Sequence, residues 1–311
     1  MMSEVAQLRP APPSAAAEPA FAEWTAGIVR RTEHALAGYL AATEEPVALH
    51  EAMRYATLGG GKRLRALLCH AAGRLVEAGP VALDAAACAI EMIHAYSLVH
   101  DDLPAMDNDL LRRGQPTVHV RYGEAMAILV GDGLQARAFE ILSEAPLPAA
   151  QRVALLRELA AASGPQGMVG GQAIDLASTG LVLSRDALAH MHRLKTGALL
   201  RAAVLMGAQC GATATDSSTL AALDGYQRAV GLAFQVVDDI LDVTSDAATL
   251  GKTPGKDAEA NKPTYVSLMG LDASRALARE LAQRAQAAIA PLGTPAAHLQ
   301  ALIASVVERV R

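Results

Sequence analysis

The sequence predicts an all-α fold, and three observations carry that prediction. Hydrophobic residues make up 52% of the chain, with alanine the most frequent of them, whereas aromatic residues are only 3%. Helices favour Ala, Leu, Met, Arg and Glu, and strands favour β-branched and aromatic side chains. Apolar residues recur with a helical period between short breaks rich in Gly, Pro and Asp, and we find no segment with the alternation of a half-buried strand. We therefore expect a single-domain bundle of ten or more helices.

The predicted domain covers residues 21–311 and is preceded by a leader. Residues 1–20 are rich in Ala and Pro and lack the basic and apolar regions of a signal peptide, so we expect them to be disordered. The segment 83–102 is apolar nearly all round, which is typical of a central buried helix. Segment 246–264 is rich in Gly, Lys and Asp and is expected to be a loop. The other expected helices are 21–42, 47–58, 63–78, 116–142, 149–163, 167–177, 184–210, 216–243, 265–270, 272–290 and 295–310.

The composition also excludes some functions. The formal net charge is -5, which argues against a nucleic-acid partner. No uninterrupted apolar run approaches the ~20 residues of a membrane helix, so we expect a cytoplasmic protein without membrane insertion. Cys69, Cys88 and Cys210 lie in apolar surroundings without metal-ligand spacing, as expected of reduced core residues.

Two clusters of aspartates are the strongest functional signal. Asp238, Asp239 and Asp242 lie in the apolar string FQVVDDILD, where offsets of three and four residues place them on one helix face. An isolated Asp pair is more simply a solvated face or a helix cap. Buried, clustered carboxylates are costly unless they are paired or bind a cation, so the apolar flanks favour a cation site.

Asp101, Asp102 and Asp107 repeat this pattern at the end of the apolar helix. Residues six apart do not share a face of a straight helix. Pro104 disfavours helical geometry at Leu103, and a break there would return Asp107 to Asp101. Oxygen ligands select hard cations, and Mg²⁺ binds through one or two carboxylates, water and phosphate oxygens. The sequence therefore predicts a polyphosphate bridged to the protein by Mg²⁺.

Two groups of basic residues are candidates for binding an anion. The string GGGKRLR (59–65) is a glycine-rich turn that leads into a helix N-terminus, which favours anions, and Lys62 and Arg65 add charge. Arg112 and Arg113 follow the first aspartate cluster. Such a pair is either an ordinary surface pair or a phosphate clamp, and its position favours the clamp.

Three lysines and a histidine complete the candidates. Lys195 lies in a long predicted helix, and Lys252 and Lys256 lie in the predicted loop, where they would close over a ligand. His94 precedes Asp101 by two helical turns on the same face. It is either a satisfied buried histidine or a ligand contact.

Five ordered motifs carry a resemblance to a known family. They are GGGKRLR (59–65), MIHAYSLVHDDLPAMDNDLLRRG (92–114), GGQAIDL (170–176), KTG (195–197) and FQVVDDILD (234–242). From about Phe21 to the C-terminus, the chain resembles the short-chain trans-isoprenyl diphosphate synthases, in particular the bacterial farnesyl diphosphate synthase type. The resemblance implies a helical bundle around a deep central cavity, a homodimer, and a reaction that joins dimethylallyl or geranyl diphosphate to isopentenyl diphosphate, giving farnesyl diphosphate (C15) and diphosphate.

The resemblance also implies roles for individual residues. Three Mg²⁺ ions on the allylic diphosphate would be held by Asp101, Asp102 and Asp107 and by Asp238 of the second cluster, which also contains Asp239 and Asp242. The allylic diphosphate would be bound by Arg112, Lys195 and Lys252. Isopentenyl diphosphate would be bound by Lys62, Arg65, His94 and Arg113. Thr196 and Gln235 would line the space in which the allylic cation forms.

Tyr96 and Ser97 are the expected determinants of product length. In the family, bulk about a turn before the first aspartate cluster limits the product, and Tyr96 precedes Asp101 by five residues. Tyr96 is otherwise an ordinary core aromatic. Geranyl and geranylgeranyl diphosphate synthases of the same family remain alternatives.

Three other classes of protein are alternatives. A terpene cyclase shares the aspartate chemistry but needs no second diphosphate site. A metal phosphohydrolase is suggested by His100-Asp101 but needs further matching histidines. An inactive partner subunit would typically lack one of the two aspartate clusters, and both are present here.

Overall fold

The computed structural model describes residues 17–41, 45–181, 183–212, 215–244 and 263–310. Most of the predicted leader and the two loop lysines, Lys252 and Lys256, lie outside this part of the chain. The helices are α1 (Ala17–Tyr39), α2 (Val47–Leu58), α3 (Leu64–Arg74), α4 (Pro80–Asp101), α5 (Val118–Tyr122), α6 (Glu124–Ser143), α7 (Ala149–Ser163), α8 (Met168–Ala177), α9 (Arg185–His192), α10 (Ala198–Gln209), α11 (Ser217–Thr244), α14 (Tyr265–Met269), α15 (Leu271–Ile289) and α16 (Ala297–Glu308). Short 3₁₀ turns at Ala290–Leu292 and Thr294–Ala296 join the last two helices.

The all-α prediction is confirmed, and several boundaries follow local sequence chemistry. The bounds of α2 and α7 agree with the predicted segments 47–58 and 149–163. Pro80 is the first residue of α4, a position that tolerates proline because its N–H is not needed there. Ser184 caps α9 by accepting a hydrogen bond from the backbone N–H of Ala187, as expected of an N-cap serine.

The structure corrects the predicted secondary structure at a small hairpin. No strand was expected, yet β1 (Leu111–Arg112) and β2 (Gln115–Pro116) pair in antiparallel fashion. The two residues between them, Arg113 and Gly114, both have positive φ, as two-residue hairpin turns require. The segment predicted as one helix, 116–142, is instead α5 and α6, which are separated at Gly123 with a φ of 88°.

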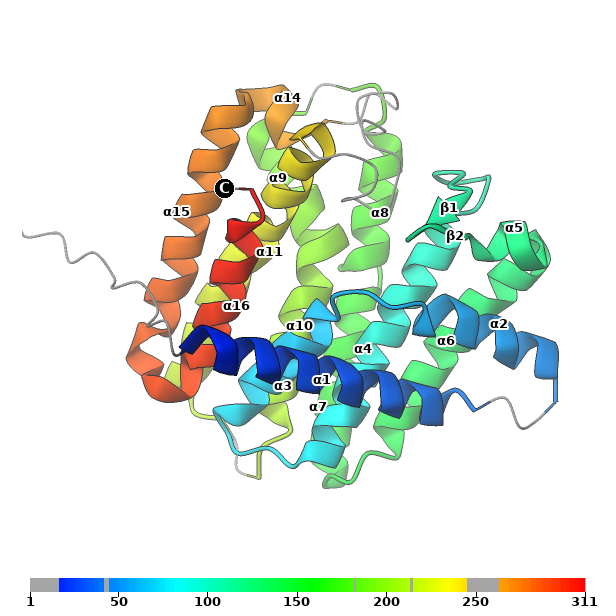
Figure 1. The fold of residues 1–311 in the computed structure, drawn as a ribbon, viewed down its shortest axis with the longest axis horizontal. Coiled ribbons are helices and arrows are strands. Elements are labelled where there is room, and N and C mark those ends of the chain that lie inside the picture. Colours follow the sequence, from blue (N-terminus) through cyan, green and yellow to red (C-terminus); the bar gives the residue numbers. More distant parts are fainter. Residues whose placement is uncertain (1–16, 42–44, 182, 213–214, 245–262, 311) are drawn as a thin grey trace, which may run out of the picture.

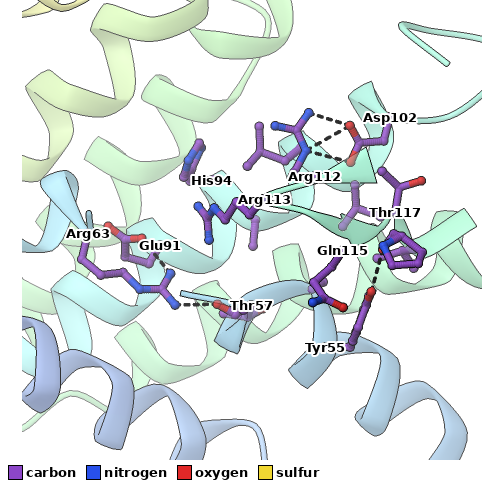
Figure 2. A pocket seen from close by; sticks show the side chains of 17 residues that line it. Tyr55, Thr57, Arg63, Glu91, His94, Asp102, Arg112, Arg113, Gln115 and Thr117 are labelled. Carbon is purple, nitrogen blue, oxygen red and sulfur yellow. Dashed lines mark hydrogen bonds and ion pairs between the residues drawn. The ribbon is translucent and has the colours of Figure 1, made fainter. Parts of the chain in front are cut away.

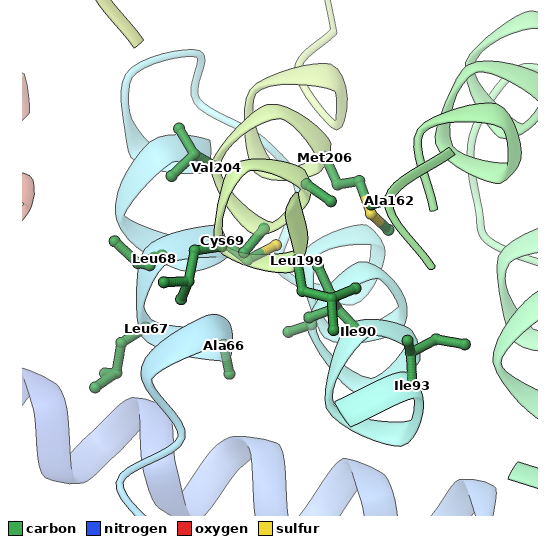
Figure 3. Packing of buried hydrophobic residues seen from close by; sticks show 14 of the residues in the cluster. Ala66, Leu67, Leu68, Cys69, Ile90, Ile93, Ala162, Leu199, Val204 and Met206 are labelled. Carbon is green, nitrogen blue, oxygen red and sulfur yellow. The ribbon is translucent and has the colours of Figure 1, made fainter. Parts of the chain in front are cut away.

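The hydrophobic core is centred on α3, α4 and α10. Figure 3 shows Leu68 and Cys69 of α3, Ile90 of α4 and Met206 of α10 packed together. The α3 and α10 backbones approach very closely, since a Cβ on Gly207 would lie 2.1 Å from the carbonyl oxygen of Cys69. Only glycine fits at that crossing.

Helix α4 is the central helix, as its apolar sequence predicted. By length and composition it is the one helix in the described ranges that is long and apolar enough to cross a membrane, but most of it is buried inside the bundle. Core helices of soluble proteins share this property. In Figure 1, α1 crosses the bundle at a steep angle to the more upright helices α8, α10, α15 and α16, and the β1–β2 hairpin lies beyond the C-terminal end of α4.

Candidate active site

The first aspartate cluster is built around the end of α4. Asp101 is the last residue of that helix, and the backbone N–H of Asp107 donates to the Asp101 carbonyl at 2.8 Å. The N–H of Asp109 likewise donates to the Asp102 carbonyl at 3.1 Å. The predicted break near Pro104 therefore exists, and it returns the chain beside Asp101.

Helix α8 supplies two partners for this cluster that the sequence analysis did not single out. Gln172 Nε2 donates to Asp101 Oδ1 at 2.5 Å, and Asp175 Oδ2 lies 2.6 Å from Lys195 Nζ. Lys195 Nζ also lies 4.0 Å from Asp101 Oδ2. The motif GGQAIDL contained both residues, and their spacing of three places them on one helix face. This spacing was the signal in the sequence that could have identified Gln172 and Asp175 as site residues.

Asp102 differs from Asp101 in its surroundings. Its carboxylate is buried and accepts hydrogen bonds from Arg112 Nε at 3.0 and 2.9 Å and from Arg112 Nη2 at 2.5 Å. Figure 2 shows the Arg112 guanidinium turned onto this carboxylate. Burial opposes the charge of Arg112, but its hydrogen bond to Asp102 and the nearby Asp101 and Asp107 raise its pKa. In this state Asp102 and Arg112 neutralise one another.

The predicted helix 184–210 contains a π-helical turn, Arg193–Gly197, which carries Lys195 and Thr196. Single π-turns inside α-helices are frequent at functional sites because they redirect side chains. Thr196 Oγ1 donates to Gln235 Oε1 at 3.3 Å, so α11 and this turn meet at two of the predicted site residues. The sequence did not reveal the turn, because a single π-turn interrupts the helical pattern too little to be distinguished from an α-helical turn.

The three aspartates of the second cluster have different environments. Asp239 is buried and accepts hydrogen bonds from Gln235 Nε2 and from the backbone N–H of Tyr265, both at 2.8 Å. Asp242 is also buried. Asp238 is 40% exposed and lies 3.6 Å from Arg309 Nη1 of the chain's last turn. Asp238 is therefore the carboxylate of this cluster that is accessible to a ligand, whereas Asp239 fixes α14 against α11.

Arg65 and Arg113 lie near His94, and Lys62 lies near Arg309 and Asp238. Burial and the charges of Arg65, Arg113, Arg112 and Arg63 hold the pKa of His94 well below its usual range. His94 is therefore neutral at pH 7. Burial also lowers the pKa of Arg65, although Glu91 and Asp238 oppose the shift. Burial and Arg309 lower the pKa of Lys62, which Asp238 raises.

Arg65 supplies an orphaned donor among these basic residues. Its Nε is buried and has no hydrogen-bond partner within the described part of the chain. A buried charged donor without a partner costs free energy. A diphosphate oxygen would satisfy it.

Arg113 links the hairpin to the glycine-rich loop. It adopts a left-handed backbone conformation with a φ of 53°, and its Nη1 donates to the Gly60 carbonyl. Gly61 has a φ of 123°, and a Cβ there would lie 2.7 Å from the Arg113 guanidinium. Gly61 is thus required twice, for its φ and for this close approach.

A pocket of about 370 Å³ opens between α2, α4 and the hairpin. His94, Arg112 and Arg113 form its polar side, and Figure 2 shows them together at one end. Its apolar wall consists of Ala56, Ala95, Leu98, Val99, Pro116 and Val118. The pocket therefore combines cationic and apolar surfaces, as a ligand with an anionic head and a hydrocarbon part would need.

Tyr96 and Ser97 lie on different faces of α4. Tyr96 is buried and makes an edge-on contact with His100, with ring centroids 5.6 Å apart. His100 Nε2 lies 3.1 Å from the carbonyl oxygen of Ile128 on α6, and a Cβ on Gly131 would collide with the His100 ring. Tyr96 is thus braced against α6. The Ser97 hydroxyl donates to the His94 carbonyl at 2.8 Å.

The carboxylates at this site suit a hard cation. In the described ranges, no three His, Cys, Asp or Glu side chains converge closely enough to hold a metal by themselves. Mg²⁺ does not need such a cage, because it binds one or two carboxylates and completes its shell with water and phosphate oxygens. Asp101 and Asp107, held side by side, fit that requirement in the presence of a polyphosphate.

Comparisons with known proteins show the family of the chain. Residues 46–292 match the polyprenyl synthetase family. A probable farnesyl diphosphate synthase of Sinorhizobium fredii is 55% identical over 283 residues, which are 90% of this chain and 85% of that protein. The farnesyl diphosphate synthase of Escherichia coli is 51% identical over 255 residues, covering 81% of this chain and 85% of that protein.

A solved structure shows the same fold. The apo FPP/GFPP synthase of Zymomonas mobilis superposes with a TM-score of 0.84 at 39% identity, covering 93% of this chain and 99% of that chain. The chain belongs to the polyprenyl synthetase family. The family resemblance seen in the sequence is confirmed.

Proposed function

We propose that the protein is a prenyltransferase that joins geranyl or dimethylallyl diphosphate to isopentenyl diphosphate and releases farnesyl diphosphate and diphosphate. One observation carries the proposal above the others: two separate groups of basic residues flank the aspartates. Arg112 and Lys195 lie against Asp102 and Asp101. Arg65 and Arg113 lie near neutral His94, and Lys62 lies near Asp238 and Arg309. Two diphosphate substrates need two such groups, and relatives at 51–55% identity bear the name farnesyl diphosphate synthase.

The first group is assigned to the allylic diphosphate. Lys195 is presented by the π-turn, and Asp175 holds its ammonium group in place. Arg112 offers a planar guanidinium that binds phosphate in bidentate fashion once it leaves Asp102. Lys252 is proposed for the same diphosphate and lies outside the described residues. These charges stabilise the leaving diphosphate as the C–O bond ionises.

The second group is assigned to isopentenyl diphosphate. Arg65 contributes a buried, orphaned donor, and Lys62 and Arg113 add charge. Neutral His94 donates a hydrogen bond without adding repulsion. Thr196 and Gln235 are proposed to line the space between the two substrates, where a cation forms on the allylic chain and is attacked by the isopentenyl double bond. The proton lost afterwards is assigned to the released diphosphate.

Mg²⁺ is proposed as the cofactor, three ions in number. Asp101 and Asp107 would hold it on one side and Asp238 on the other, with Asp102, Asp239 and Asp242 as neighbouring carboxylates. Bound there, the ions would neutralise the diphosphate and lower the barrier to its departure. Asp239 has a structural task as well, since both of its oxygens accept hydrogen bonds from the protein.

The product is proposed to be C15 because Tyr96 closes the space beside α4. Its contact with His100 and α6 makes it a rigid obstacle. Synthases of the same family that make C10 or C20 products remain the alternatives. The Zymomonas mobilis relative is described as an FPP/GFPP synthase, which indicates that product length varies within this group.

The partner is proposed to be a second copy of the chain, in the cytoplasm. Val120 of α5 and Ile128 and Leu129 of α6 are 48%, 47% and 52% exposed, a neighbouring apolar set that supports a homodimer. Light scattering of the purified protein is expected to give twice the mass of the chain, and a monomer would contradict this part of the proposal.

Substrate dependence tests the proposed reaction against a cyclase. The protein is incubated with Mg²⁺ and geranyl diphosphate, with and without isopentenyl diphosphate, and both diphosphates are quantified over time. A synthase consumes the two in equal amounts and leaves geranyl diphosphate intact when alone. Consumption of geranyl diphosphate alone would favour a cyclase or a phosphohydrolase.

A further inference from the structure

The glycine-rich loop rests on a buried arginine that was not assigned to the site. The Arg63 side chain is 3% exposed. Its guanidinium donates to Glu33 Oε1 at 2.7 Å, to Glu91 Oε2 at 3.1 Å and to the Thr57 carbonyl at 2.5 Å. One residue of the loop is therefore held by α1, by α4 and by the end of α2, and Figure 2 shows the Arg63–Glu91 and Arg63–Thr57 contacts.

Glu91 holds the other side of the same turn. Its second oxygen, Oε1, accepts a hydrogen bond from the backbone N–H of Ala66 at 3.2 Å. Ala66 is the third residue of α3, and the N-cap position, Arg63, provides no side-chain cap. N-cap side chains normally satisfy this N–H. Glu91 caps α3 from a different helix, and its negative charge favours the helix N-terminus.

The backbone of Arg63 needs this support. Its φ of 48° lies in the left-handed region, which is unfavourable for a non-glycine residue. Such conformations persist where the surroundings over-determine them. The turn at Arg63 sets the direction in which Lys62 leaves the loop and in which α3 starts, and Arg65 is the second residue of α3.

We propose that Arg63 and Glu91 are positioning residues for the isopentenyl diphosphate site. Both line the pocket, but the Arg63 guanidinium is already engaged by Glu33, Glu91 and the Thr57 carbonyl. Their ion pair fixes the left-handed turn, so that Lys62 and Arg65 point toward the same diphosphate. This inference rests on the proposed function and deepens it. A buried ion pair is seldom needed for stability alone. The hydrogen bonds from Arg63 to the Thr57 carbonyl and from the Ala66 N–H to Glu91 connect this pair to the geometry of the turn.

The chain offers a control in a second arginine–carboxylate pair that also involves α4. Arg31 of α1 bonds Asp84 of α4 at 2.6 Å through both carboxylate oxygens. This pair makes no contact with residues 59–66. Its loss should affect the packing of α1 on α4 without affecting the loop.

The test compares Michaelis constants for the two substrates in Arg63→Lys, Glu91→Gln and the control Arg31→Lys. In the first two variants, KM for isopentenyl diphosphate should rise roughly ten- to a hundred-fold, the equivalent of one lost hydrogen bond to a charged group. KM for geranyl diphosphate should change less than about two-fold, within experimental scatter. Arg31→Lys should leave both constants unchanged. Equal increases in both constants, or no increase, would overturn the proposal.

A double variant separates positioning from stability. Arg63→Met/Glu91→Met replaces the pair by apolar side chains of similar size, which often restores stability. The thermal midpoint should recover relative to the single variants while KM for isopentenyl diphosphate stays raised. Recovery of both would show that the pair is only structural.

A binding measurement distinguishes this inference from the proposed reaction. If the wild-type protein does not join the two substrates, the proposed function fails. Calorimetric titration with isopentenyl diphosphate alone then tests the positioning role. Wild-type binding that weakens in Arg63→Lys supports it, and equal binding, or none in the wild type, overturns it.

Discussion

Asp107 returns to Asp101 through the backbone itself, because the Asp107 N–H donates to the Asp101 carbonyl at 2.8 Å. Six residues separate them, which on a continuous helix would direct their side chains apart. The break after α4 removes this obstacle and brings the backbones of the two residues together. This relationship underlies the proposed metal and substrate chemistry.

Neutralising either of these aspartates should impair turnover. Asp101→Asn or Asp107→Asn preserves the shape of the side chain but removes a charge, so kcat should fall by roughly 10²-fold or more. The Mg²⁺ concentration needed for half-maximal rate should also rise. Asp272→Asn, a fully exposed residue of α15, is the control and should leave both values unchanged. Full activity of either site variant would contradict the assignment.

Removing the bulk of Tyr96 should lengthen the product. Tyr96→Ala opens space beside α4, where the ring contacts His100, so chromatography of the prenyl products should show chains longer than C15. Tyr122→Ala, which removes an aromatic ring in edge-on contact with Tyr55, is the matched control and should still give C15. A C15 product alone from Tyr96→Ala would exclude this residue as the limit.

Acid should weaken the fold through two buried histidines. Burial lowers the pKa of His70 and of His192 to about 4, from an ordinary value of 6.5. Between these values the unfolded chain binds protons that the folded chain does not. Stability is therefore full above pH 6.5 and is lost as the pH falls toward 4, by up to about 1.4 kcal/mol per pH unit for each histidine.

Urea unfolding at pH 7 and pH 5 measures this effect. The loss of stability between the two values should be smaller in His192→Asn than in the wild type, whereas His34→Asn, at an exposed position, should keep the wild-type difference. An identical loss in all three proteins would exclude His192 as a source.

The crossing of α3 and α10 should tolerate only glycine. Gly207→Ala would place a Cβ 2.1 Å from the Cys69 carbonyl oxygen, and such overpacking typically costs about 1–3 kcal/mol, occasionally more. Gly27→Ala, within α1 and without atoms within 4 Å of the added carbon, should instead stabilise by about 0.5–1 kcal/mol. Urea unfolding of the two variants should give changes of opposite sign.

Much of the fold was accessible from the sequence because helical periodicity and chain breaks are local properties. The apolar run that became α4 and the break at Pro104 both followed from neighbouring residues. The hairpin at Arg113 was missed because two-residue strands have no periodicity to detect. The π-turn at Lys195 was missed because its residues also suit an ordinary α-helix.

The site was only partly accessible for a different reason. The sequence identified the charged residues, but it could not show which of them pair with each other. The contact of Arg309 with Asp238 and the hydrogen bond from the Tyr265 N–H to Asp239 join segments far apart in the chain, and the pairing of Asp102 with Arg112 depends on the hairpin. Such pairings depend on tertiary structure.

Product analysis with both substrates tests the central claim most directly. The purified protein is incubated with geranyl diphosphate, isotopically labelled isopentenyl diphosphate and Mg²⁺, and the products are identified by chromatography and mass spectrometry. The account predicts labelled farnesyl diphosphate together with an equal amount of released diphosphate. The absence of any labelled prenyl product would contradict it.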